Sequence, residues 1–263
     1  MRLKWMRLAK VFLRACLIEE FEYRANTFAN LLMTLFWLAM AVLTVNLYFF
    51  NTNHIGGWTY DEVLVLLGLF NAIQGFIQFF LQPNMTRLVS HIRKGTLDFV
   101  LTKPVDSMFY TSFRHLVFWR LADVALGLGL SAYALARMGQ WPDWPQWGLF
   151  AVVFLASLAV VYSLCMMMMT LSFWTVKVDN LSYLFVSFFE SARYPITVYG
   201  GVLRLVLTYV VPLAFITTVP AEALTGRLDG TGAFAAAGLA AVLLVLARCF
   251  WNYAVKHYTS ASS

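Results

Sequence analysis

Long apolar stretches alternate with short polar connections along almost the whole chain. Six of these stretches approach the roughly 20 residues that a helix needs to cross the hydrocarbon core of a bilayer. The pattern therefore predicts an all-α integral membrane protein, with six transmembrane helices in a single domain, 1–263. The predicted spans are 27–50, 63–81, 116–138, 148–174, 196–219 and 233–250.

Residues 2–18 follow a different pattern, with cations on one side of a helix. At 100° per residue these cations fall within an arc of about 120°, and most apolar side chains lie outside it. We expect a helix that rests in the membrane interface, its cations toward anionic headgroups. The alternative is a helix packed on the protein's own loops. The cations are Lys4, Arg7, Lys10 and Arg14.

The only sizeable polar connection between apolar spans, residues 84–106, predicts two short amphipathic helices with a glycine hinge. Asn84 is suited to cap the first helix, and Gly95 can end it as the residue after its C-cap. Thr96 is suited to cap the second helix, and Pro104 stops it.

The second of these helices has an apolar edge formed by Leu97, Val100 and Leu101. A short amphipathic helix between membrane spans is suited to docking on another protein. The alternative is a solvated loop that rests on the membrane surface. The composition of the stretch does not decide between the two.

The composition supports a membrane protein. Hydrophobic residues make up 61% of the chain and charged residues 12%, with a mean hydropathy of +0.71, whereas a soluble domain carries about 25% charged residues. The net charge of +6 could suggest nucleic acid as a partner. If the N-terminus is cytoplasmic, however, every Lys and Arg except Arg137, Arg204 and Arg227 belongs to the cytoplasmic side. This positive-inside asymmetry predicts that both termini are cytoplasmic, and argues against nucleic-acid binding.

The second predicted span carries a stripe of amide side chains within an arc of about 80°. Unsatisfied amides are costly in lipid, so the stripe must face another helix or water. It can line a substrate path, or it can make hydrogen bonds between helices, with Gly68 and Gly75 beside it allowing close approach; a misplaced span is the third alternative. The stripe is Asn71, Gln74, Gln78 and Gln82.

Three further charged residues lie within or near the predicted spans. Arg204 is predicted on the inner half of span 196–219, where it either serves the substrate path or subunit interface, or snorkels to the headgroups. Arg120 and Asp123 are spaced to form an ion pair on one helix.

The sequence lacks the motifs of an enzyme. It contains no phosphate loop, no G-x-S-x-G and no H-E-x-x-H motif. The cysteines and histidines are scattered, so we expect no metal site. We therefore predict a protein that is not an enzyme and that has no ATP site of its own.

The polar stretch Gly95-Thr96-Leu97-Asp98, with Leu101 and Pro104-Val105 after it, resembles a motif of the permease subunits of type-2 ABC exporters. The predicted topology also resembles the short six-span members of about 260 residues in that family. That family often has Glu-Arg where this chain has His91 and Ile92, so this chain departs from the family's pattern at these two positions.

The resemblance implies a permease that forms half of a pathway in the bacterial inner membrane. A second permease, identical or paralogous, would form the other half, and a cytoplasmic ABC ATPase dimer would hold ATP and Mg²⁺. The alternatives are an ion-gradient-driven secondary transporter and a non-transporting membrane scaffold. The resemblance assigns coupling to the ATPase to Arg93, Lys94, Gly95, Thr96, Leu97, Asp98, Val100, Leu101 and Pro104.

Overall fold

The computed structural model describes residues 24–139, 141–175 and 186–258, with side chains from residue 28 onward. Every regular element in these ranges is a helix, as predicted; the interfacial helix expected at 2–18 lies outside them. The elements are α2 Arg24–Phe49, α3 Tyr60–Phe76, η1 Ile77–Leu81, α4 Gln82–Arg93, α5 Asp98–Leu101, α6 Ser107–Phe113, η2 Phe118–Arg120, α7 Leu121–Met138, α8 Trp144–Thr170, η3 Leu171–Phe173, η4 Ile196–Val198, α10 Gly201–Leu205, η5 Val206–Val210, η6 Leu213–Phe215, α11 Thr218–Leu224 and α12 Gly230–Lys256.

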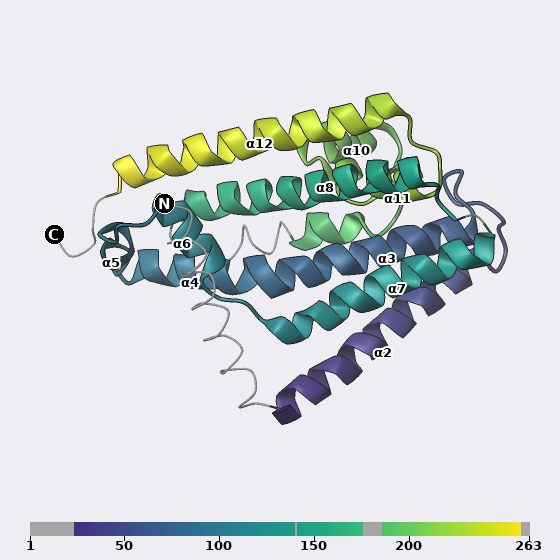
Figure 1. Ribbon diagram of the computed structural model, residues 1–263, viewed down its shortest axis with the longest axis horizontal. Coiled ribbons are helices and arrows are strands. Elements are labelled where there is room, and N and C mark those ends of the chain that lie inside the picture. Colours follow the sequence, from purple (N-terminus) through teal and green to yellow (C-terminus); the bar gives the residue numbers. More distant parts are fainter. Residues whose placement is uncertain (1–23, 140, 176–185, 259–263) are drawn as a thin grey trace.

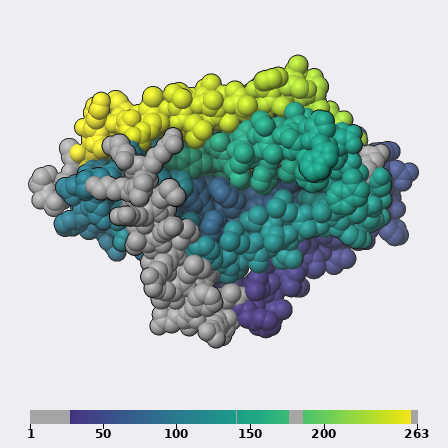
Figure 2. All heavy atoms as spheres, in the orientation of Figure 1, coloured from purple at the N-terminus to yellow at the C-terminus, as the bar shows by residue number. Residues whose placement is uncertain are grey.

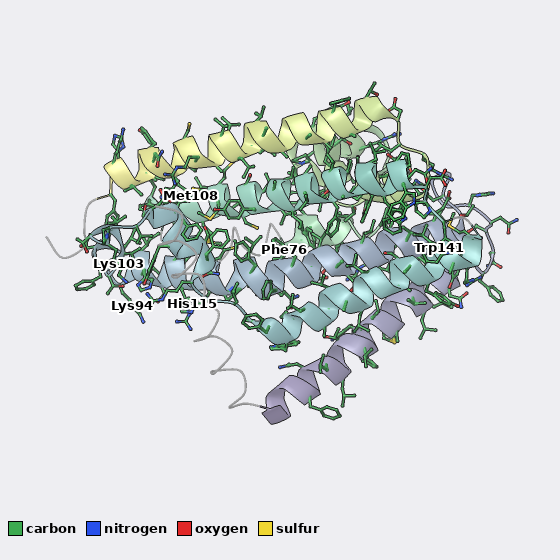
Figure 3. The ribbon with its side chains drawn as sticks, in the orientation of Figure 1. Phe76, Lys94, Lys103, Met108, His115 and Trp141 are labelled. Atoms are coloured by element: carbon green, nitrogen blue, oxygen red, sulfur yellow. The ribbon has the colours of Figure 1, made fainter. Side chains whose placement is uncertain are left out.

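The long helices run along one axis of the molecule, and their connections gather at two ends (Figure 1). The end with α5, α6 and the C-terminal end of α12 is called the α5 end. The other, called the opposite end, carries the connections 50–59, 141–143 and 225–229. Lys94, Lys103 and His115 lie at the α5 end and Trp141 at the opposite end (Figure 3). In the space-filling view, α12 and α2 form two edges of the molecule (Figure 2).

Five helices in the described part are long and apolar enough to cross a membrane, and a bent pair at 201–224 makes a sixth candidate. This agrees with the predicted membrane fold. α7 packs along α3, and α12 packs along α8. The predicted ion pair of Arg120 with Asp123 forms at 3.0 Å.

The helix that runs through α3, η1 and α4 is longer than the predicted second span. Its 34 residues, Tyr60–Arg93, extend about 51 Å, whereas the hydrocarbon core is only about 30 Å thick. The helix therefore projects beyond the bilayer. The prediction that this span ends at residue 81, with Asn84 as the cap of a new helix, is therefore wrong, because the helix continues through Pro83.

The helix passes Pro83 because other donors replace the N–H that proline lacks. η1 is a π-helical turn, in which the N–H of Gln82 reaches back to the carbonyl of Ile77. The carbonyl of Phe79, four residues before Pro83, accepts a hydrogen bond from the N–H of Val117 at 3.0 Å. The side chain of Asn84 donates to the carbonyl of Phe80 at 2.7 Å. These bonds satisfy the backbone around a proline that would otherwise break the helix.

Small residues allow α3 and α7 to approach closely. A Cβ at Gly127 would lie 2.5 Å from the backbone nitrogen of Ala72 and from the carbonyl oxygen of Gly68. Ser131 on α7 donates to the carbonyl of Val65 on α3 at 3.0 Å. Gly68 and Gly75, which flank the amide stripe, thus have the close-packing role that their spacing indicated.

Gly127→Ala is expected to destabilise the protein by about 1–3 kcal/mol, because the new methyl group meets backbone atoms that cannot move alone. Gly129→Ala on the same helix is the matched control, since a Cβ there has nothing within 4 Å. Thermal unfolding in detergent, followed by tryptophan fluorescence, measures both. Equal midpoints for the two variants would contradict the close packing.

The predicted span 196–219 is placed differently in the structure. Thr197 donates to the carbonyl of Gly56 at 2.7 Å, and Arg227 donates to the carbonyl of Gly57 at 3.1 Å. Both sides of the bent pair 201–224 therefore reach the opposite end. Trp174 stacks on Phe250 near the α5 end, whereas Thr197 lies at the opposite end.

Proline and glycine explain why 196–219 does not form one straight helix. Pro195 and Pro212 lie outside helices, and Gly201 has a φ of +55°, which L-residues rarely adopt. The two halves of the pair bend by 64°. Arg204 is exposed on α10, in the first half of this bent pair, and not on a straight span.

Candidate functional site

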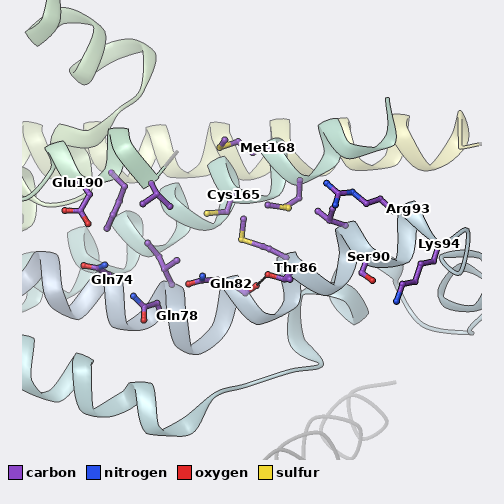
Figure 4. Close-up of a pocket in the computed structure, with 16 residues that line it drawn as sticks. Gln74, Gln78, Gln82, Thr86, Ser90, Arg93, Lys94, Cys165, Met168 and Glu190 are labelled. Atoms are coloured by element: carbon purple, nitrogen blue, oxygen red, sulfur yellow. Dashed lines mark hydrogen bonds between the residues drawn. The ribbon is translucent and has the colours of Figure 1, made fainter. Parts of the chain in front are cut away.

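The amide stripe, which runs along α3, η1 and the start of α4, borders a cavity of about 710 Å³ (Figure 4). Three of its four predicted members, Gln74, Gln78 and Gln82, line this cavity. The fourth, Asn71, is not among its lining residues; its side chain donates to the carbonyl of Leu67 on the same helix at 2.8 Å. The structure therefore brings most of the stripe to one wall.

The polar wall continues further than the sequence analysis expected. Residues four apart drift by about 40° per step around an α-helix, but a π-turn rotates less per residue and offsets this drift. The polar positions after η1 consequently stay on the same wall. A polar residue every fourth position is a signal already present in the sequence. The lining positions are Gln74, Gln78, Gln82, Thr86, Ser90 and Lys94.

The facing wall is apolar and rich in sulfur. Cys165, Met168 and Met169 of α8 line it, together with Val186 and Phe189. The methionine run 166–169 of α8 thus contributes both to the buried core and to the cavity surface. Thioethers are flexible and polarizable, so this wall can adapt to apolar groups of different shapes.

Charged side chains mark the two ends of the cavity. Arg93 and Lys94 lie toward the α5 end, and Glu190 lies at the other extreme (Figure 4). The carboxylate of Glu190 pairs with Arg193 at 2.7 Å. Glu190 is not among the predicted site residues, because it lies between the predicted spans 148–174 and 196–219.

Aromatic rings lie beside this ion pair. The ring of Phe70 on α3 stacks on Phe189 with centroids 5.0 Å apart, and the guanidinium of Arg193 lies 5.3 Å from the Phe70 centroid. Both phenylalanines are buried. Next to Glu190 the cavity therefore borders on packed aromatic side chains.

The turn after α4 forms at Gly95, as the sequence predicted. α4 ends at Arg93, and Gly95 follows with a φ of +66°. Thr96 does not cap the second helix, however; its hydroxyl lies 2.8 Å from Nδ1 of His91, and its N–H donates to the carbonyl of His91 at 2.9 Å. Thr96 thus closes the glycine turn back onto α4, and Leu97 takes the cap position of α5 without a side-chain hydrogen bond.

The apolar edge of α5 packs into this chain and is not presented outward. Leu97 is 0% exposed and Val100 is 3% exposed, both in a cluster with Leu88 and Trp251. Phe99 points the other way and is 72% exposed. Together with Arg93, Lys94, Lys103 and Pro104 it forms an outward surface, called here the α5 surface. Asp98 and Leu101 are partly buried beside it.

The segment that follows α5 forms hydrogen bonds and an ion pair with α12. Asp106 caps α6 by accepting from the N–H of Phe109 at 2.8 Å, and it pairs with Arg248 of α12, with one bond at 2.9 Å. The bond from Arg248 lowers the pKa of the Asp106 carboxyl below its ordinary value, so this acid stays ionised at neutral pH. Trp251 of α12 donates to the hydroxyl of Ser107 at 3.1 Å. A shift of the α5 surface would therefore reach α12.

A second fastening joins α4 to the segment before α7. Asn84, 4% exposed, donates to the carbonyl of His115 at 2.7 Å and accepts from its N–H at 3.0 Å. Burial, followed by the charges of Arg87 and Arg114, lowers the pKa of His115 to about 4. The imidazole is consequently neutral at physiological pH and adds no charge at this junction.

Comparison with known proteins gives the family. A family model described as ABC-2 family transporter protein matches residues 35–262. No curated protein and no solved structure matches the chain. The match covers most of the sequence and agrees with the motif at Gly95–Pro104 and with the helical membrane fold. The chain belongs to the ABC-2 transporter family, whose members are membrane components of transporters.

Proposed function

We propose that this chain is the permease subunit of an ATP-binding-cassette exporter, forming half of a transmembrane pathway. The observation that carries the proposal is one continuous helix, Tyr60–Arg93, which joins the cavity to the α5 surface. Its polar wall runs from Gln74 to Lys94, where the outward surface begins. A rigid rod between a docking surface and a cavity can convert movement at one into a change of shape at the other.

The partner that drives this movement is a cytoplasmic ABC ATPase dimer, which holds ATP and Mg²⁺. Phe99 on the α5 surface gives an aromatic anchor, and the cations Arg93, Lys94 and Lys103 give a polar rim, the usual composition of a protein interface. These cations gather at the α5 end, which supports a cytoplasmic position for it in the bacterial inner membrane. This chain then contributes no ATP site.

A second permease, identical or paralogous, completes the pathway. α2 supports this, because it leaves a long apolar face exposed that includes Phe36, Trp37 and Leu47. Part of such a face can lie against lipid and part against a partner helix. Arg204, exposed on α10, is retained as a candidate for the subunit interface.

Purification from the native membrane in mild detergent is expected to recover an ABC ATPase and a second permease copy or paralogue. The complex should hydrolyse ATP in a vanadate-sensitive manner after reconstitution. A complex without any ATPase, whose transport follows an imposed ion gradient, would establish the secondary-transporter alternative. A purified chain with no ATPase and no transport would favour a scaffold.

A further inference from the structure

We propose that Glu190 makes the cavity selective for amphipathic organic cations, so that this class is the transported substrate. The inference rests on the proposed transport function and names the ligand of the same cavity. Among the described residues that line the cavity, Glu190 is the only acid, and it lies at the end remote from Arg93 and Lys94. An acid that lines a cavity among membrane-spanning helices needs a cationic partner.

In the structure that partner is Arg193, at 2.7 Å. The carboxylate is nevertheless accessible, since 40% of the Glu190 side chain is exposed and it faces the cavity. Arg193 is not among the residues that line the cavity, and it is held aside by its contact with the Phe70 ring. A cation that enters the cavity can thus reach the carboxylate and compete with Arg193 for it.

The distribution of charge along the cavity favours the same orientation. A cation is repelled by Arg93 and Lys94 at the α5 end and attracted by Glu190 at the other. Between the two ends of the cavity, Oε1 of Gln78 is buried without a hydrogen-bond partner among the described residues. This amide oxygen carries a partial negative charge, which also favours a cation. The wall of Met168, Met169 and Phe189 suits the apolar part of the ligand, and polarizable sulfur and aromatic faces tolerate positive charge.

The test uses two probes of nearly the same size and shape but opposite charge, tetraphenylphosphonium and tetraphenylborate. Their binding is measured by equilibrium dialysis to the purified permease in phosphatidylcholine nanodiscs, with empty nanodiscs subtracted. Glu190→Gln should weaken phosphonium binding roughly tenfold, the loss expected for one partly solvated charge contact. It should leave borate binding unchanged or tighter.

Arg193→Gln provides the decisive contrast. It removes the competing cation, so phosphonium binding should become tighter by roughly severalfold to tenfold. A merely structural ion pair would make both variants weaken binding, which would overturn the proposal. Glu190→Asp keeps the charge and should retain most of the selectivity. Glu222→Gln, an acid on α11 that is absent from the cavity lining, is the matched control.

Phosphonium affinity that does not respond to Glu190→Gln in a folded protein also overturns the inference. So does a preference of the unaltered protein for borate. Because these measurements need neither ATP nor a partner, their failure leaves the proposed exporter function standing. Failure to recover an ATPase would instead refute the exporter and leave the measured selectivity intact.

Discussion

Phe99→Ala is expected to abolish ATP-driven transport while leaving the permease folded. The side chain is 72% exposed and sits among cations on the α5 surface, so its loss removes little packing within this chain. A central aromatic anchor of an interface is worth roughly 2–4 kcal/mol. Affinity for the ATPase should therefore fall by about 30-fold to 1,000-fold. Co-purification of the ATPase, together with transport-coupled ATP hydrolysis, measures the effect.

Leu97→Ala is the control for a structural effect. Leu97 lies two residues from Phe99 but is fully buried against this chain's own helices. Its truncation should lower the thermal midpoint through a cavity cost of about 2–5 kcal/mol, whereas Phe99→Ala should leave the midpoint nearly unchanged. A Phe99→Ala variant that assembles with normal affinity would show that the ATPase docks elsewhere.

The contrast between Leu97 and Phe99 shows what an amphipathic pattern can and cannot predict. Leu97, Val100 and Leu101 do form the buried edge of α5, as their spacing indicated. The spacing does not say what buries them, and here they pack on α4, α6, α8 and α12 of the same chain. Phe99 lies on the other side of this short helix from Leu97 and Val100. An aromatic residue at such a position was the feature of the sequence that indicated an exposed apolar surface.

The predicted fifth span, 196–219, differs from the structure for a related reason. Hydropathy identifies apolar segments, but it does not distinguish a straight span from a bent pair that returns to the same end. The hydrogen bonds of Thr197 and Arg227 to the 56–57 turn decide the matter, and such long-range contacts leave no local pattern. The same misplacement hid Glu190 and counted Arg193 among the cytoplasmic cations, although it lies against Phe70.

The amide wall was predictable because it depends on local periodicity. Gln74, Gln78 and Gln82 sit on one helix at a regular spacing, and burial of amides requires a polar neighbour or water. The extension through Thr86 and Ser90 lies beyond the predicted span, which ends at residue 81, because a proline inside a helix usually breaks it. The replacement of its missing hydrogen bond by Val117, more than thirty residues later, depends on tertiary structure.

Asn84→Leu is expected to cause the largest loss of stability, about 3–5 kcal/mol. The change leaves the partly buried N–H and carbonyl of His115 without the side-chain partner that the structure gives them. Each unsatisfied buried group costs about 1–3 kcal/mol. Thermal unfolding in detergent should show a midpoint well below that of the unaltered protein.

Asn71→Leu is the matched control, with the same substitution on the same long helix. The Asn71 amide donates only to the carbonyl of Leu67, four residues earlier, which the helix backbone already satisfies. Its loss should cost less than about 1 kcal/mol. The difference between the two variants measures how firmly α4 is tied to the segment before α7. Equal losses would mean that Asn84 is only another helical amide and does not tie α4 to the segment before α7.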